Sequence, residues 1–155
     1  MDENRQEVET VNANLRVRRA YSKKEREKAF GIRMRVFVRE QGVPKEIEMD
    51  RDDDRALHFL AFAAGKAVGT ARIVMRHGRA KIGRMAVLKG YRGRGVGKEL
   101  LKRAVATARR RRAQTIYLHA QVPVIGFYEI LGFQCAGRVF EEAGIPHRKM
   151  ILMRT

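Results

Sequence analysis

The chain is poor in cysteine: its 155 residues include only Cys135, so no internal disulfide bond can form. This is typical of proteins in a reducing cytoplasm, where we expect this one to work. Cys135 lies in an apolar stretch without a C-x-x-C partner, which favours a small core residue over a nucleophile. Long apolar runs are missing too, since none reaches the roughly 20 residues that cross a bilayer. Residues 1–10 are polar and acidic, unlike an export signal, so we expect neither a membrane span nor secretion.

Acidic residues are scarce beside basic ones. The sequence has 17 Asp and Glu against 34 Lys and Arg, which gives a formal net charge of +17. Such an excess makes contact with nucleic acid, the ribosome or another polyanion a reasonable hypothesis. However, the basic residues are scattered, and aromatic residues that would stack on bases are not interleaved with them. The arginines at 109–112 also close a predicted helix, where cations interact favourably with the helix dipole. A solvated basic surface is therefore favoured over a nucleic-acid partner.

The chain also lacks linkers and internal repeats, and its length suits one domain with one core. Residues 1–14 have no periodicity and are expected to form a loose leader before a single domain over residues 15–155. A capping box at Ser22 and Glu25 predicts the start of the first helix, and glycine turns separate alternating apolar segments. The predicted strands span residues 15–20, 57–63, 67–75, 80–87, 115–120, 133–140 and 149–153. The predicted helices span residues 22–41, 96–112 and 123–131. Residues 45–55 are expected to form an acidic loop.

This order of elements predicts the fold class. One strand, a helix, three antiparallel strands, a helix, a strand, a helix and two strands give an α/β protein of mixed α+β type. We expect a central mixed sheet with helices on both faces.

The segment Arg92-Gly93-Arg94-Gly95-Val96-Gly97 joins an apolar strand to the second predicted helix. Glycines allow positive φ and close backbone approach, and the free N–H groups of a first helical turn face an anion, so the segment predicts a phosphate-binding loop. A P-loop is excluded because Arg92 stands where its first glycine belongs and Glu99 replaces the hydroxyl residue. A dinucleotide-binding G-x-G-x-x-G motif is excluded because its third glycine would fall on Lys98 or Leu100.

Two motifs together resemble a known family. Arg92, Gly95 and Gly97 fit the pattern Arg-x-x-Gly-x-Gly, and Tyr128 precedes Leu131-Gly132-Phe133 on the helix after the fifth predicted strand. In this order and spacing they resemble the GNAT superfamily of acetyl-coenzyme A (acetyl-CoA) dependent N-acetyltransferases, over residues 82–133. The resemblance implies a largely antiparallel sheet of six to seven strands. It also implies acetyl-CoA as the acetyl donor, with no metal.

The resemblance also implies which residues hold the donor. Its pyrophosphate would lie on the glycine loop, and its pantetheine arm would add like an extra strand to the edge of the third antiparallel strand. The cofactor-binding residues would be Met85, Ala86, Val87, Arg92, Gly93, Arg94, Gly95, Val96, Gly97 and Lys98. The hydroxyl of Tyr128 would protonate the departing thiolate, with an aromatic packing role as the alternative.

The general base is not assigned by the sequence. Many GNAT enzymes use a glutamate on the strand before the glycine loop, but residues 81–85 contain none. Glu40, His58, His119 and His147 are candidates, and a water chain is the alternative. A histidine suits the task because its pKa lies near neutrality.

A further likeness concerns the acceptor side. Four features of the sequence resemble a subset of small bacterial GNAT proteins. They are a Glu-Gln turn at Glu40 and Gln41, an acidic stretch over residues 50–54, His58, and a late Gly-Ile-Pro-His that ends at His147. This implies that Gln41 and His58 bind the substrate, and acidic groups there would suit a cationic amine. The alternative is that these residues cap helices and tie loops together.

The expected function is therefore acetyl transfer from acetyl-CoA to a primary amine of a small molecule or protein, by direct attack in a ternary complex. The alternative is a basic module that contacts RNA or ribosomes without catalysis. The resemblance also makes a homodimer possible.

Overall fold

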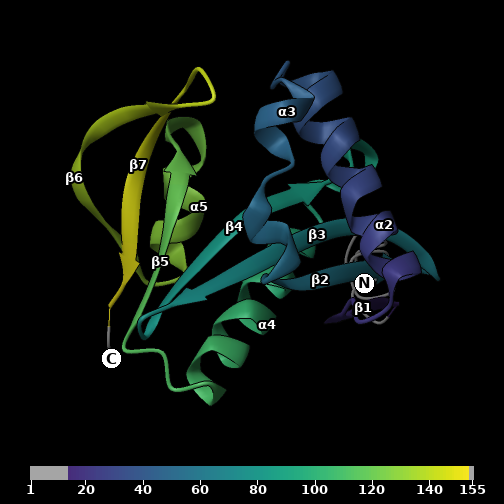
Figure 1. Cartoon of the computed structure of the whole chain (residues 1–155), viewed down its shortest axis with the longest axis horizontal. Coiled ribbons are helices and arrows are strands. Elements are labelled where there is room, and N and C mark those ends of the chain that lie inside the picture. Colours follow the sequence, from purple (N-terminus) through teal and green to yellow (C-terminus); the bar gives the residue numbers. More distant parts are fainter. Residues whose placement is uncertain (1–13, 154–155) are drawn as a thin grey trace, which may run out of the picture.

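A seven-stranded sheet forms the centre of the protein in the computed structural model, which describes residues 14–153 (Figure 1). Its order is β1-β2-β3-β4-β5-β7-β6, and every neighbouring pair is antiparallel except β4 with β5. This confirms the predicted mixed, largely antiparallel sheet. The strands are β1 (Leu15–Arg19), β2 (Leu57–Ala63), β3 (Lys66–Arg76), β4 (Arg79–Val87), β5 (Thr115–Gln121), β6 (Phe133–Glu142) and β7 (Ile145–Leu152).

Within residues 14–153, four α-helices accompany the sheet: α2 (Lys23–Arg33), α3 (Lys45–Glu48), α4 (Val96–Arg110) and α5 (Ile125–Ile130). The first predicted helix does not stay α-helical to residue 41, because it widens into a π-helical segment at Met34–Glu40. The predicted loop over residues 45–55 contains α3 and a 3-10 turn at Arg51–Asp54. The last strand begins at Ile145, four residues earlier than predicted. Residues 1–13 of the expected leader lie outside the described residues.

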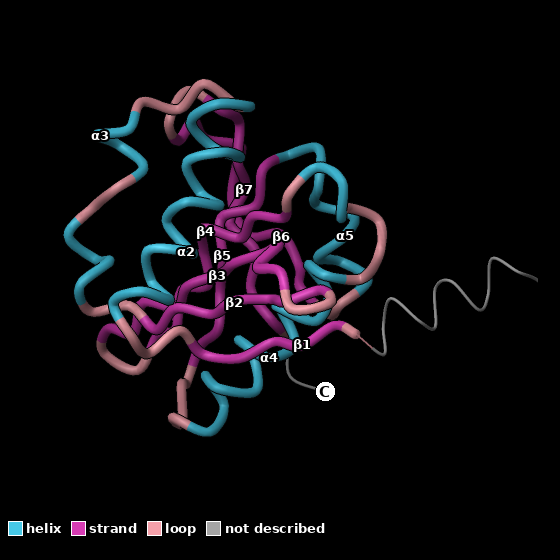
Figure 2. Tube along the Cα trace, turned by 90° about the vertical axis from the view of Figure 1, so that its right-hand side faces the viewer, coloured by secondary structure: helices cyan, strands magenta, loops and turns pink. Residues whose placement is uncertain are grey.

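Helices cover both faces of the sheet, as predicted, and α2 and α5 lie on opposite sides of the strands (Figure 2). On β2, Phe59 packs into the core beneath α4, whereas its neighbour Leu60 packs with Ala29 and Ile32 of α2 on the other face. Successive side chains of a strand point to opposite faces, and β2 is apolar at every position except His58 because both of its faces are covered. Within the described residues, no helix combines the length and apolar character needed to cross a bilayer.

The middle of the sheet splits where the two parallel strands meet. β4 and β5 pair only from Arg79↔Thr115 to Ile82↔Leu118, although both strands continue beyond that point. A bulge interrupts β4 just there: Thr70 pairs with Ala86 and Arg72 with Gly83, so two residues of β4, Arg84 and Met85, stand opposite the single residue Ala71. One of them, Arg84, has a φ of 48°. The strands diverge beyond the bulge (Figure 1), and the free edge of β4 faces the gap.

Candidate active site

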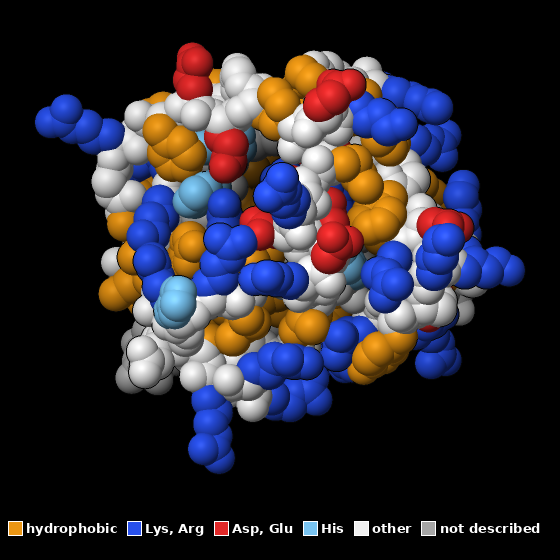
Figure 3. Space-filling view, viewed as in Figure 1, with side chains coloured by type: hydrophobic (Ala, Val, Ile, Leu, Met, Phe, Trp, Pro, Cys, Tyr) orange, Lys and Arg blue, Asp and Glu red, His pale blue; other side chains and the backbone are white. Residues whose placement is uncertain are grey.

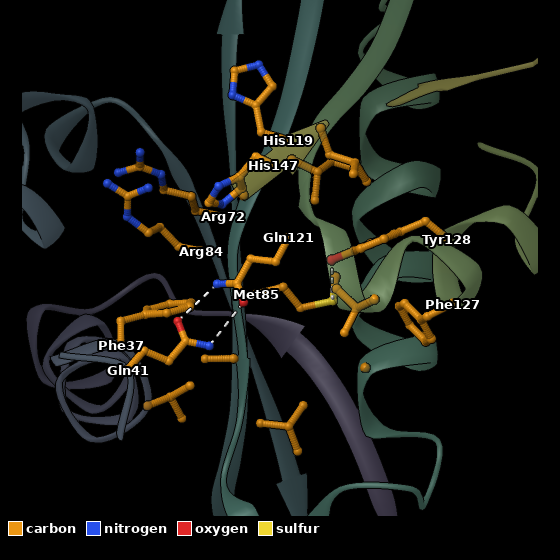
Figure 4. Close-up of a pocket in the computed structure, with 18 of the residues that line it drawn as sticks. Phe37, Gln41, Arg72, Arg84, Met85, His119, Gln121, Phe127, Tyr128 and His147 are labelled. Atoms are coloured by element: carbon orange, nitrogen blue, oxygen red, sulfur yellow. Dashed lines mark hydrogen bonds between the residues drawn. The ribbon is translucent and has the colours of Figure 1, made fainter. Parts of the chain in front are cut away.

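A cavity of about 830 Å³ opens between the diverging strands. It reaches from the glycine loop before α4, past β4, to the hairpin between β6 and β7, and Figure 4 shows its middle part. Most of the predicted site residues meet there although they come from distant parts of the sequence. Those that line the cavity are Gln41, Met85, Ala86, Val87, Arg92, Gly93, Gly95, Val96, Gly97, Lys98, His119, Tyr128 and His147.

The glycine loop has the backbone expected of an anion site. Gly93 has a φ of 75°, and Gly95, which precedes the first residue of α4, has a φ of 83°. The first intrahelical bond of α4 runs from the amide of Glu99 to the carbonyl of Gly95, at 3.0 Å. The amides of residues 96–98 therefore have no intrahelical acceptor and present their N–H groups at the positive end of the helix dipole.

Arg92 ties this loop to its surroundings. Its Nε donates to the carbonyl of Val87 at 2.9 Å, and its Nη2 donates to Glu40 at 2.8 Å. Glu40 thus serves as the ion-pair partner of Arg92 and does not line the cavity. Arg94 also lies outside the lining, where its guanidinium is 5.9 Å from the centre of the Tyr91 ring.

Beyond the bulge, Met85, Ala86 and Val87 have β3 on one side and no strand on the other. Ala86 pairs with Thr70 of β3, while β5 has already separated from β4. The open side lies in the cavity between the glycine loop and Tyr128. It offers backbone hydrogen-bonding groups to an extended ligand, as an unpaired sheet edge does.

Tyr128 projects from α5 toward Met85 across the cavity (Figure 4). Its ring packs edge-on against Phe127 and Phe133, with ring centres 5.0 and 6.1 Å away. The hydroxyl donates to the Met85 sulfur at 3.9 Å, and sulfur is a weak acceptor. Burial raises the pKa of Tyr128 to about 12, so the phenol stays protonated at neutral pH. The site thus holds a neutral O–H donor beside a soft acceptor that a ligand can replace.

The other end of the cavity holds a cluster of charged groups around Glu142, a residue that the sequence analysis missed. Nδ1 of His119 lies 3.3 Å from Oε1 of Glu142, and Nε2 of His147 lies 3.6 Å from Oε2. Nζ of Lys81 is 3.9 Å from Oε1. The hydrogen bond from His119, together with the charge of Lys81, lowers the pKa of Glu142 to about 2. Glu142 is therefore an anion at every physiological pH.

His58 is buried and lies outside the cavity. Its Nε2 is 2.9 Å from the carbonyl oxygen of Asp53, and its ring makes an edge contact with Phe30. Burial lowers the pKa of His58, which keeps the ring neutral in the core. The geometry gives His58 a packing role and keeps it from a substrate in the cavity. Gln41, by contrast, lines the cavity and exchanges two hydrogen bonds with Gln121, at 2.9 and 3.2 Å (Figure 4).

The acidic stretch does not line the cavity either. Asp50 and Asp53 bind Arg72 at 2.7 and 2.9 Å, and Asp53 also binds Arg33 at 2.7 Å. Glu48 of α3 completes the network through Arg33 and Arg84. Three guanidinium groups thus face the carboxylates of Glu48, Asp50 and Asp53, so this network ties α3 and the 3-10 turn to β3 and β4, and its carboxylates are paired with arginines. Within residues 14–153, no cluster of three or more potential ligands forms a metal site.

Comparisons with known proteins agree with this geometry. An acetyltransferase (GNAT) domain model matches residues 4–154. The chain is 36% identical to the uncharacterized N-acetyltransferase YjcF of Bacillus subtilis, over 79% of this chain and 89% of YjcF. It resembles the structure of a putative N-acetyltransferase from Lactobacillus plantarum, with a TM-score of 0.82 and 26% identity, over 90% of this chain and 99% of the other. An acyl-CoA N-acyltransferase from Pseudomonas aeruginosa gives a TM-score of 0.78 and 28% identity, with the same coverage.

Proposed function

The chain belongs to the GNAT acetyltransferase family, and from that premise we propose that it transfers an acetyl group from acetyl-CoA directly to a primary amine. The observation that carries the proposal is the single cavity that joins an anion-binding loop, a free strand edge and a buried phenol. The donor needs all three, since it has a pyrophosphate, an extended amide-rich arm and a thioester.

The donor would lie along β4. Its pyrophosphate would accept hydrogen bonds from the free amides of residues 93–98, beside the charges of Arg92 and Lys98. Its pantetheine arm would follow Met85–Val87, whose open edge supplies backbone donors and acceptors. The thioester would then reach Tyr128 at the far side of Met85.

Tyr128 would protonate the departing sulfur. The amine nitrogen attacks the thioester carbonyl, the C–N bond forms, the C–S bond breaks, and sulfur leaves with the electron pair. The buried phenol is protonated whenever the donor arrives, because its pKa of about 12 lies well above neutral pH. The same desolvation makes a thiolate in this place more basic, which favours transfer of the proton.

The acceptor must lose a proton before it attacks. His119 and His147 both line the cavity and are the candidates that the geometry supports for this step. The geometry does not support Glu40 or His58 as the base, because Glu40 binds Arg92 and His58 is buried outside the cavity. Gln41 is positioned to contact the substrate or the pantetheine arm. Lys and Arg side chains are spread over the face shown in Figure 3, between apolar and acidic side chains. No observation on the described residues favours the RNA- or ribosome-binding alternative. A homodimer and a cytoplasmic location stay predictions.

The experiment is thiol release from acetyl-CoA against benzylamine, putrescine, lysine methyl ester and a short peptide with a free amino terminus. We expect turnover with at least one amine, and a loss of about 10- to 100-fold in kcat for Tyr128→Phe with acetyl-CoA affinity retained. Phe127→Leu, which alters a neighbouring ring without an acidic group, is the control. Tight acetyl-CoA binding without turnover of any amine would refute the enzymatic proposal. An unchanged rate in Tyr128→Phe would remove the phenol from the reaction.

A further inference from the structure

Glu142 lies at the end of the cavity near the hairpin between β6 and β7, and the role inferred for it rests on the proposed function. Glu142 is the last residue of β6, and the tight turn at residues 143–144 returns the chain to β7. Its partly exposed carboxylate faces an imidazole from β5 and another from β7, and all three groups line the cavity. In Figure 4 the two histidines lie together at the end of the site beyond Met85 and Gln121.

The tautomer of His147 is fixed by its backbone neighbour. Its Nδ1 lies 2.6 Å from the carbonyl oxygen of Ile145, and a carbonyl can only accept, so Nδ1 carries the hydrogen. In the neutral ring Nε2 then has a lone pair. That lone pair faces Oε2 of Glu142 across 3.6 Å, and two acceptors at this distance have no hydrogen between them. The pair is satisfied by a group that donates to both atoms.

We propose that Oε2 of Glu142 and Nε2 of His147 form the subsite for the ammonium group of the acceptor, and that Nε2 takes its proton. An ammonium group has three N–H donors, so it can bond to both atoms at once. The carboxylate attracts the cation, and the imidazole accepts the hydrogen that must leave. One N–H remains, and once the proton has left, the nitrogen can turn its lone pair toward the thioester.

The roles of the two groups are distinct. Glu142 is a poor base, since the pKa of its carboxyl is about 2, whereas free imidazole has a reference pKa near 6.5. The carboxylate instead stabilises the imidazolium that forms, as an acidic partner does for a catalytic histidine. His119 is a positioning residue, because its Nδ1–H donates to Oε1 and turns the other oxygen toward His147. Phe140 packs edge-on against His119 and face-on against His147, with ring centres at 4.9 and 6.0 Å.

The proton balance closes without another reactant. The acceptor R–NH3⁺ gives one proton to His147, which passes it to solvent. The amine then forms the C–N bond, and sulfur leaves with the C–S electron pair and takes the proton of Tyr128. The nitrogen loses its second proton as the amide forms, and this proton restores Tyr128. The sum is ammonium plus thioester giving amide, thiol and one released proton.

Other charged groups around Glu142 must be counted in any pH profile. Lys81 faces the carboxylate from β4, and burial lowers its pKa although Glu142 opposes the shift. Arg72 and Arg84 act on Lys81 from a greater distance and lower its pKa further. His119 and His147 complete the set from β5 and β7.

The first test needs no acceptor. The chain has four histidines, so imidazole ¹⁵N resonances can be assigned and followed. We expect His147 at pH 8 to show a protonated Nδ1 and an unprotonated Nε2. In His119→Leu, which has no side-chain donor, the pKa of the Glu142 carboxyl, followed by ¹³C, should rise from about 2, because its main hydrogen bond is lost. A protonated Nε2 on neutral His147, or an unchanged Glu142 titration, would overturn the inference.

The second test uses the amine that the wild type acetylates fastest. Glu142→Gln should raise the KM for that amine about tenfold or more, and His147→Gln should lower kcat about 100-fold, both with the KM for acetyl-CoA unchanged. Glu141→Gln is the matched control, because it removes the same charge from an exposed neighbour on β6. Equal kinetics in Glu142→Gln and Glu141→Gln would overturn the inference. A wild type that acetylates no amine would instead count against the proposed function, and the resonances of His147 and Glu142 would still decide the subsite.

Discussion

Gly69 on β3 offers a sharp test of how the fold positions the glycine loop. A methyl group at Gly69 would lie 2.9 Å from Cγ1 of Val96, 3.0 Å from Cδ1 of Leu100 and 3.3 Å from the carbonyl oxygen of Ala86. The first two contacts are with α4, and Val96 is its first residue, directly after Gly95. The absence of a side chain at Gly69 thus lets the start of α4 lie against the sheet.

The expected cost of Gly69→Ala follows from these contacts. Val96 and Leu100 are almost completely buried, and an added Cβ only 2.9 and 3.0 Å from their side chains forces the packing between β3 and α4 to shift. Overpacking of this kind costs about 1–3 kcal/mol. For a chain of about 150 residues this lowers Tm by about 2–10 °C. Because the shift falls on the first turn of α4, acetyl-CoA affinity should fall as well.

Thermal and urea unfolding give the stability, and calorimetric titration with acetyl-CoA gives the affinity. Gly31→Ala is the control with the opposite sign: Gly31 is an exposed interior residue of α2 with nothing within 4 Å of an added Cβ. Alanine there should stabilise by about 0.5–1 kcal/mol through helix propensity and leave acetyl-CoA binding unchanged. If Gly69→Ala has the same Tm as the wild type, α4 does not lie as close to β3 at this position as the structure places it. If it is destabilised but binds acetyl-CoA normally, the packing does not control the loop.

Two further predictions concern the loop and the charged groups. Gly95→Ala should weaken acetyl-CoA binding about 5- to 30-fold, because a φ of 83° costs an L-residue about 1–2 kcal/mol. Calorimetric titration measures the affinity, and a wild-type value would show that binding does not need this loop conformation. Acid should destabilise the protein below about pH 4: the arginine partners of Asp50, and His119 beside Glu142, lower both carboxyl pKa values to about 2. The free energy of unfolding that these two carboxylates contribute is fully present above the pKa values of the unfolded chain, near 4, and is lost as the pH falls toward 2. Urea unfolding midpoints that stay constant from pH 5 to 2.5 would contradict this prediction.

The sequence predicts the order of elements well because its signals are local. Apolar alternation, the capping box at Ser22 and the glycine turns each act over a few residues, and the structure confirms the sheet that they imply. The π-helical widening at Met34–Glu40 has no such signal. It depends on how the end of the first helix packs against β4, which is tertiary information.

The residues at the glycine-loop end of the cavity could be predicted from the sequence for the same reason. The glycine loop and the Tyr128 motif are contiguous segments, and the structure brings them to one cavity. Glu142 could not be predicted, because its position depends on the register between β6 and β7, which shifts between Ala136 and Phe140. A strand predicted to start at residue 149 leaves out the pairing of His147 with Phe140 and of Ile145 with Glu142, which brings the imidazole near this carboxylate. The missing signal was pairing across a hairpin.

The acidic stretch shows why charge in a sequence does not locate a cation site. Asp50 and Asp53 look available to an amine when the chain is read alone, yet each meets an arginine from β3 or α2 in the folded protein. A buried carboxylate without a partner would be costly, so the fold that buries these groups must also neutralise them. Glu142 differs because its partners are two histidines and Lys81 rather than arginines, and one of its oxygens faces a histidine lone pair. We therefore expect the acceptor ammonium group to bind beside Glu142, which lines the cavity, rather than at the acidic stretch, which does not.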